Sequence, residues 1–152
     1  MFGWMGKVLR IDLTKQGIST ESLTKEQMEL YLGGRGLGVE ILFREVPRGT
    51  NPLSPENKMV FATGPLTGTG TPTSGRYSVI TRSPLTGTIF DSNSGGHFGV
   101  QLKRCGWDAI VVEGRGERPN YLWIRDDLVE IRNADHLWGS NTHATEDKVR
   151  SE

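Results

Sequence analysis

Cysteine is almost absent from this sequence of 152 residues, which contains only Cys105. A single cysteine excludes an internal disulfide and a metal site built from cysteines alone. Long apolar runs are missing too, and none approaches the roughly 20 residues that span a bilayer. Neither sign of charge is in excess, since 18 Lys and Arg balance 18 Asp and Glu. No overall field would therefore attract nucleic acid or a membrane surface.

Signals for export and for self-contained catalysis are also lacking. The N-terminus, MFGWMGKVLRIDL, has no basic stretch followed by an apolar one, which argues against a secretory signal and indicates a cytoplasmic protein. The three histidines show no zinc-ligand spacing, and no Gly-x-Ser-x-Gly nucleophile motif occurs. Cys105 lies near the C-terminus of a predicted helix, whose dipole disfavours a thiolate, and this favours an inert thiol. The sequence thus predicts a binding platform more than a complete active site.

What the sequence has in abundance is glycine, concentrated between Gly64 and Gly99. This stretch contains eight glycines and three prolines among hydroxyl side chains, with one clear strand at Tyr77–Thr81. The pentapeptide Pro-Leu-Thr-Gly-Thr occurs in it twice, at Pro65–Thr69 and Pro84–Thr88. Glycine-rich loops between strands expose backbone N–H groups and let a ligand approach closely. We interpret the stretch as two similar loops that form one binding surface for a polar, phosphate-bearing ligand.

The flanking segments predict an α+β fold with a β-rich core and a few short helices. Thr24 and Gln27 form a capping-box pattern, and a second short helix is predicted at Leu37–Arg44 with Phe43 mostly buried. A last helix opens near Thr142. Alternating or continuous apolar residues predict strands at Lys7–Leu13, Ile18 onward, Met59–Thr63, Thr88–Asp91, Ala109–Glu113, and a hairpin of Tyr121–Arg125 and Leu128–Arg132.

Gly33–Gly38 resembles a dinucleotide-binding glycine motif but lacks its second glycine, and it follows a predicted helix where that motif needs a strand. One interpretation is a glycine corner between two helices. The other is that Arg35 contacts an anionic ligand or a neighbouring domain.

Two groups are candidate ligand contacts. Asn93, Ser94, Gly95 and Gly96 are predicted to open a helix, whose N-terminal N–H groups would suit a phosphate, with Asn93 as its cap and the Asn93 carbonyl facing outward. The alternative is an ordinary asparagine cap. Arg76 is predicted at a strand end, where its guanidinium could hold a phosphate or could merely be solvated. Arg82 has a similar but weaker setting.

Several motifs in order carry a resemblance to a known family: GKVLRIDLT, YLGGRGLG, NPLSPENKMVFATGPLTGTGTPTSGRYSVITRSPLTG, DSNSGGHFG and GWDAIVVEG. From about Gly6 onward the sequence resembles the N-terminal domain of the aldehyde:ferredoxin oxidoreductase family. The resemblance implies a domain of two sheets with pseudo-twofold symmetry. It also implies that residues 1–152 are the C-terminally trimmed tungstopterin-binding domain of a longer enzyme.

Such enzymes oxidise aldehydes to carboxylic acids and pass electrons to ferredoxin. By this resemblance, Arg76, Asn93 and Gly95, with Ser94 and Gly96 in the same motif, would bind a tungsten bis-pterin cofactor, with molybdenum as a possible replacement for the tungsten. The Asn93 carbonyl would bind a Mg²⁺ ion between the two pterin phosphates. A [4Fe-4S] cluster would have its ligands outside this chain, which alone would be inactive, and a homo-oligomer is expected. The competing hypothesis is a non-catalytic module that binds a nucleotide or another phosphorylated partner.

Overall fold

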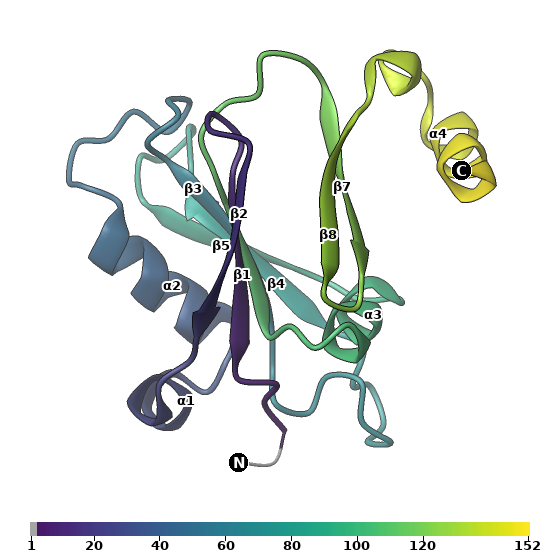
Figure 1. The fold of residues 1–152 in the computed structure, drawn as a ribbon. Coiled ribbons are helices and arrows are strands. Elements are labelled where there is room, and N and C mark those ends of the chain that lie inside the picture. The colour runs from purple at the N-terminus through teal and green to yellow at the C-terminus, as the bar shows by residue number, and fades with distance from the viewer. Residues whose placement is uncertain (1–2) are drawn as a thin grey trace.

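The computed structural model describes residues 3–152 and contains two β-sheets with short helices around them (Figure 1). The larger sheet has six strands in the order β2-β1-β6-β3-β4-β5. Their bounds are β1 Lys7–Asp12, β2 Gly17–Ser22, β3 Lys58–Thr63, β4 Tyr77–Arg82, β5 Ile89–Ser94 and β6 Ala109–Glu113. The smaller sheet is the hairpin of β7 Asn120–Arg125 and β8 Leu128–Asn133. The predicted α+β fold with two sheets is therefore confirmed.

Strand β6 lies at the centre of the larger sheet, although it comes late in the sequence. It pairs in parallel with β1 and antiparallel with β3. Because both faces of a central strand are covered, its residues are apolar without alternation, and Ala109, Ile110 and Val111 are fully buried. Every other neighbouring pair in this sheet is antiparallel.

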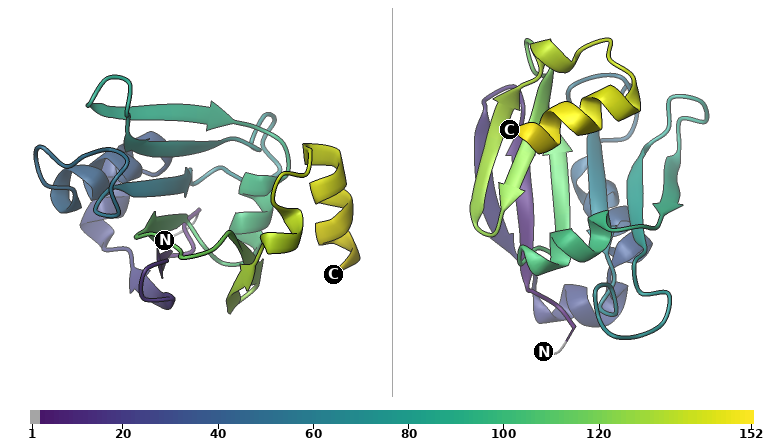
Figure 2. Two further views of the ribbon diagram at one scale, coloured as in Figure 1. Left: turned by 90° about the horizontal axis from the view of Figure 1, so that it is seen from above. Right: turned by 90° about the vertical axis from the view of Figure 1, so that its right-hand side faces the viewer.

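The helices divide between the two faces of the larger sheet, as both views in Figure 2 show. Helices α1, Lys25–Tyr31, and α2, Gly34–Glu45, cover one face and enclose a core cluster around Leu37, Ile41, Val60 and Ile80. The other face carries α3, Phe98–Arg104, and the β7–β8 hairpin, with a second cluster around Leu9, Ile11 and Trp107.

Helix α1 begins as predicted, with a complete capping box. The Gln27 N–H donates to Thr24 Oγ1 at 3.1 Å, and the Thr24 N–H donates to Gln27 Oε1 at 3.0 Å. These two bonds satisfy donors that the first turn of a helix leaves unpaired.

Helix α2 differs from its prediction in two ways. The helix begins at Gly34, three residues before its predicted start, so the predicted glycine corner between two helices is confined to Leu32 and Gly33. Gly38 lies inside the helix and packs closely on the sheet, because a Cβ there would lie 2.4 Å from Ile80 Cδ1 of β4. Phe43 was expected to be mostly buried, yet 78% of its surface is exposed. Leu42 and Ile41 occupy the face toward the sheet, which turns Phe43 outward.

The C-terminal part follows the hairpin with a 3₁₀ turn at Asp135–Leu137 and helix α4, Thr142–Ser151. The Asn141 side chain caps α4 by accepting from the Ala144 N–H at 2.9 Å. None of the residues of α4 is buried. Across residues 3–152, no helix is long and apolar enough to cross a membrane.

Candidate functional site

One buried threonine forms hydrogen bonds to both ends of the loop between β3 and β4. Thr67 Oγ1 accepts from the Gly64 N–H and donates to the Arg76 carbonyl, both at 3.0 Å. Only 7% of the Thr67 surface is exposed. The Gly68 N–H donates to the Ser74 carbonyl at 3.0 Å, and Gly68 has a φ of +79°, which glycine adopts without strain. These bonds hold Arg76 at the start of β4.

Strand β5 brings Asn93 and Ser94 to the same end of the sheet as Arg76. Tyr77 pairs with Ser94 and Ser78 with Asn93 in the antiparallel register. The helix expected to open at Asn93 begins only at Phe98, so Asn93 is a strand residue and not a helix cap. The prediction of a helix N-terminus at this motif was therefore wrong. Pairing with β4 extends β5 to Ser94 and overrides the local turn signal of the Asn-Ser-Gly-Gly sequence.

The backbone of Asn93 nevertheless faces outward. The Ser83 N–H donates to the Thr88 carbonyl at 2.8 Å, so these two residues occupy a hydrogen-bonded position next to the β4–β5 ladder. Hydrogen-bonded and non-hydrogen-bonded pairs alternate along antiparallel strands. By that alternation the Ser78–Asn93 pair is non-hydrogen-bonded. Since β5 is the last strand of the sheet, the Asn93 C=O and N–H point to its free edge.

The side chain of Asn93 is held on the α2 side of the sheet. Ser78 Oγ donates to Asn93 Oδ1 at 2.8 Å, and Asn93 Nδ2 donates to Asp91 Oδ2 at 3.2 Å. Asp91 in turn lies 3.5 Å from Arg35 Nη1. These contacts hold the side chain away from the free edge, to which the Asn93 backbone carbonyl points.

Glycines let three segments meet beside Arg76. A Cβ on Gly99 would lie 3.2 Å from the Gly75 carbonyl and 3.3 Å from Tyr77 Cβ, so only glycine fits there comfortably. A Cβ on Gly75 would lie 3.0 Å from the Gly96 carbonyl. Gly95 and Gly96 themselves have open space beside their Cα atoms. The result is a surface of exposed backbone next to Arg76, which we call the cradle.

Arg76 is exposed at this cradle, and its guanidinium has no ion-pair partner among residues 3–152. The structure therefore brings the five predicted ligand contacts to one end of the sheet: Arg76, Asn93, Ser94, Gly95 and Gly96. Exposed N–H donors and a guanidinium fit the oxygens of a phosphate, and the outward Asn93 carbonyl is a hard oxygen ligand of the kind Mg²⁺ prefers. No cluster of three or more His, Cys, Asp or Glu side chains suited to a metal ion occurs in the described part of the chain.

The two Pro-Leu-Thr-Gly-Thr repeats do not form one surface. The first follows β3 and the second follows β4, and these strands are antiparallel. The loops therefore lie at opposite ends of the sheet, and Arg82 lies with the second. Thr67 and Ser78, which position the backbone of Arg76 and the side chain of Asn93, were not among the predicted site residues. Nothing in the sequence distinguishes these two hydroxyls from the many others nearby.

Comparison with known proteins identifies the family to which the chain is similar. Residues 8–152 match the family described as aldehyde ferredoxin oxidoreductase, N-terminal domain. Tungsten-containing aldehyde ferredoxin oxidoreductases of Pyrococcus abyssi and Thermococcus kodakarensis are 51% and 49% identical to the chain over 152 residues. In both cases the match covers the whole chain but only 25% of the relative. The chain thus spans about a quarter of the length of these relatives.

Two further relatives differ in their described activity. The WOR-like subunit of an aliphatic sulfonate oxidoreductase from Pyrococcus furiosus is 36% identical over 91% of this chain and 22% of its own length. The active-site complex BamBC of benzoyl coenzyme A reductase, solved with 1,5-dienoyl-CoA, contains a chain that is 39% identical. It aligns with a TM-score of 0.96 over 99% of this chain and 23% of that one. The chain belongs to the aldehyde ferredoxin oxidoreductase N-terminal domain family.

Proposed function

We propose that residues 1–152 are the cofactor-binding N-terminal domain of a longer, cytoplasmic, tungsten-containing oxidoreductase that converts aldehydes to carboxylic acids and passes electrons to ferredoxin. The family match and the names of relatives at 49–51% identity support an oxidoreductase of this kind. The choice of aldehyde over sulfonate as substrate rests on the higher identity to the aldehyde enzymes, 51% against 36%.

The observation that carries the binding role is the convergence of Arg76 with the free-edge backbone of Asn93 and with Gly95 and Gly96. In the proposed complex, Arg76 and the backbone N–H groups of the two glycines bind the phosphates of a bis-pterin cofactor. The Asn93 carbonyl would hold the Mg²⁺ ion that accompanies the cofactor. When bound, this cofactor would supply the redox chemistry of aldehyde oxidation. A [4Fe-4S] cluster, held by residues beyond this chain, would carry the electrons toward ferredoxin, and the enzyme would act as a homo-oligomer.

The chain's own part in this function is to bind and orient. Thr67 holds the Arg76 backbone carbonyl, and Ser78 holds the Asn93 side chain, so the backbone that carries both ligand contacts is positioned before a phosphate arrives. Preorganised donors avoid part of the entropy cost of ordering on binding. The groups described at this site are suited to binding an anion and include no paired acid and base, so the chemistry is assigned to the cofactor and to the remainder of the enzyme.

The test is Arg76→Ala in the full-length protein. A hydrogen bond to a charged group contributes roughly 1.5–3 kcal/mol, so cofactor affinity should fall about tenfold to a hundredfold. Tungsten would be measured by mass spectrometry and pterin by fluorescence after release. Arg125→Ala, an exposed arginine on the hairpin, is the matched control. Unchanged tungsten and pterin in Arg76→Ala, with the fold intact by circular dichroism, would refute the assigned role.

A further inference from the structure

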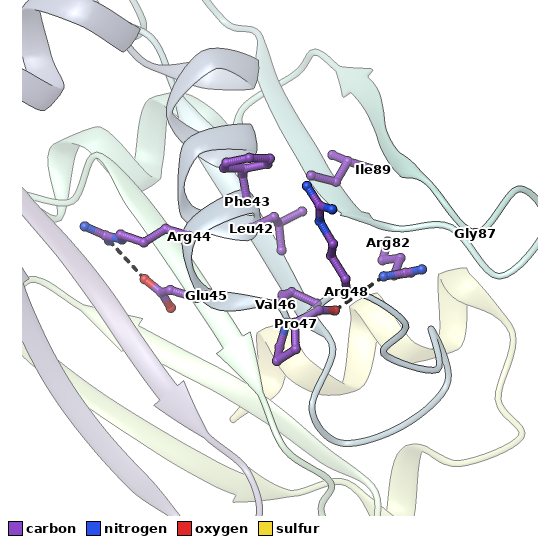
Figure 3. Close-up of a pocket in the computed structure, with 10 residues that line it drawn as sticks. All are labelled: Leu42, Phe43, Arg44, Glu45, Val46, Pro47, Arg48, Arg82, Gly87 and Ile89. Atoms are coloured by element: carbon purple, nitrogen blue, oxygen red, sulfur yellow. Dashed lines mark hydrogen bonds and ion pairs between the residues drawn. The ribbon is translucent and has the colours of Figure 1, made fainter.

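A hollow lies at the opposite end of β4 from the proposed cofactor site. It is formed where the C-terminal end of α2 meets the β4–β5 loop and has a volume of about 290 Å³ (Figure 3). Its walls are mainly apolar, with Leu42, Val46 and Ile89 among them, and three arginines, Arg44, Arg48 and Arg82, line it together with Glu45. Arg82 ends β4 while Arg76 precedes it, so about 17 Å of strand separates the hollow from the cradle.

Two of these three arginines, Arg48 and Arg82, lack a carboxylate partner in the described part of the chain. No Asp or Glu among residues 3–152 forms an ion pair with Arg48 or Arg82. The one acceptor near the Arg82 guanidinium is the Pro47 carbonyl, 3.5 Å from Nη1 and shown by the dashed line in Figure 3. Arg82 Nε is buried and has no acceptor. A buried donor without an acceptor is costly, which points to a missing partner group.

The arginines of α2, in contrast, form ion pairs with carboxylates of the same chain. Arg44 Nη2 lies 3.0 Å from Glu45 Oε1, and Arg44 Nη1 lies 3.5 Å from Glu40 Oε1. Arg35 pairs with Asp91. Within residues 3–152, the chain therefore supplies carboxylates to Arg35 and Arg44 but none to Arg48 or Arg82.

The rim of the hollow is apolar and exposed. Phe43 is 78% exposed and Ile89 is 36% exposed. Large apolar side chains grouped around unpaired charges are typical of a surface that another polypeptide segment covers.

We propose that this hollow binds an aspartate or glutamate side chain from the polypeptide that follows Glu152 in the full-length protein. The inference rests on the proposed function, in which this chain is the first domain of a longer polypeptide. The relatives are about four times as long as this chain, since it covers 25% of them. A segment in the same polypeptide has a high effective concentration and needs little intrinsic affinity. Its carboxylate would accept hydrogen bonds from both guanidinium groups, and a flanking apolar side chain would pack on Phe43 and Ile89.

Zero-length cross-linking in the full-length protein identifies the partner directly. Arg82→Lys and Arg48→Lys each place an amine in the hollow, which a carbodiimide couples to any carboxylate in contact with it. Peptide mass spectrometry should find the new lysine joined to an Asp or Glu beyond residue 152. Arg44→Lys is the control, because its partner Glu40 lies within the chain and should give an intradomain product. Mixing isotopically labelled and unlabelled protein separates links within one polypeptide from links between two copies.

The proposal would be overturned by cross-links that form only between copies or only within residues 3–152. It would also be overturned if neither variant gave a cross-link while Arg44→Lys coupled normally. Hydrogen exchange on the unmutated proteins gives an independent check that does not depend on the variants folding. Amides in 42–48 and 82–89 should exchange at least about tenfold more slowly in the full-length protein than in the 152-residue chain. Equal rates would also overturn it. Either failure would leave tungsten and pterin binding at Arg76 unaffected, so it would be distinct from a failure of the proposed function.

Discussion

Lys103 and Asp108 form an ion pair inside the protein, with Lys103 Nζ 2.5 Å from Asp108 Oδ1 and side chains that are 5% and 2% exposed. The same carboxylate accepts from the N–H groups of Met5 and Gly6, at 3.1 and 2.6 Å. Lys103 Nζ also donates to the Gly3 carbonyl at 2.7 Å. The pair thus connects the N-terminal segment to α3 and to the residue before β6, near the loop that carries Thr67.

Removing one member of this pair should destabilise the protein strongly. Lys103→Met leaves the Asp108 carboxylate buried without its counter-charge, a change that typically costs about 3–5 kcal/mol. Urea unfolding followed by circular dichroism would measure the loss. Lys7→Met, which breaks an exposed pair with Asp127, should cost no more than about 1 kcal/mol. Similar losses in the two variants would mean that the buried pair contributes little.

Glu45 should make the stability of the protein dependent on pH in the acid range. Burial by itself would raise the pKa of Glu45, but hydrogen bonds and charge from Arg10, together with Arg44 and Lys58, hold that pKa below its usual value. Arg10 donates to both oxygens, at 2.6 and 2.7 Å. A carboxyl with a lowered pKa in the folded state stabilises it fully above the unfolded-state pKa, near 4.3 for Glu. That contribution is lost as the pH falls through the folded-state pKa.

Glu45→Gln should therefore lower the urea midpoint at pH 7 and make its decline between about pH 5 and pH 3 shallower. Measurements of the midpoint at half-unit pH steps would show both effects. Glu56→Gln serves as the control, because Glu56 is exposed and has no ion pair within the described chain. Parallel curves for Glu45→Gln and the unmutated protein would contradict this account.

Gly38→Ala should destabilise the protein, although alanine favours a helix by about 1 kcal/mol over glycine. The new methyl group would lie 2.4 Å from Ile80 Cδ1 and 3.1 Å from Ile80 Cβ, so a rotamer change of Ile80 cannot relieve the contact fully. Overpacking of this kind costs about 1–3 kcal/mol. Thermal unfolding of Gly38→Ala and of Gly38→Ala with Ile80→Val would check it. The second substitution should recover part of the loss, and a gain in stability from Gly38→Ala alone would refute close packing.

Local sequence patterns predicted many individual elements of the fold. Strand β6 matches its predicted range, Ala109–Glu113, and the β7–β8 hairpin differs only at its outer residues. The capping box of α1 was predicted from Thr24 and Gln27. These features depend on side chains a few residues apart, so their physics is present in the sequence itself. The choice of Arg76 and the Asn93–Gly96 motif as ligand contacts came from loop glycines and family motifs.

The relations between distant segments were decided by tertiary structure. Asn93 is predicted as a helix cap by its neighbours, yet pairing with Ser78 makes it an edge-strand residue. Gly38 reads as part of a helix corner until the contact with Ile80 shows why glycine is needed there. Whether the two Pro-Leu-Thr-Gly-Thr loops share a surface depends on the direction of β3 against β4, which no local pattern contains. The sequence alone determined which residues could form strands, caps and phosphate contacts, because short-range periodicity and side-chain chemistry set those. Which of them meet, and at which end of the sheet, was decided only by long-range pairing and packing.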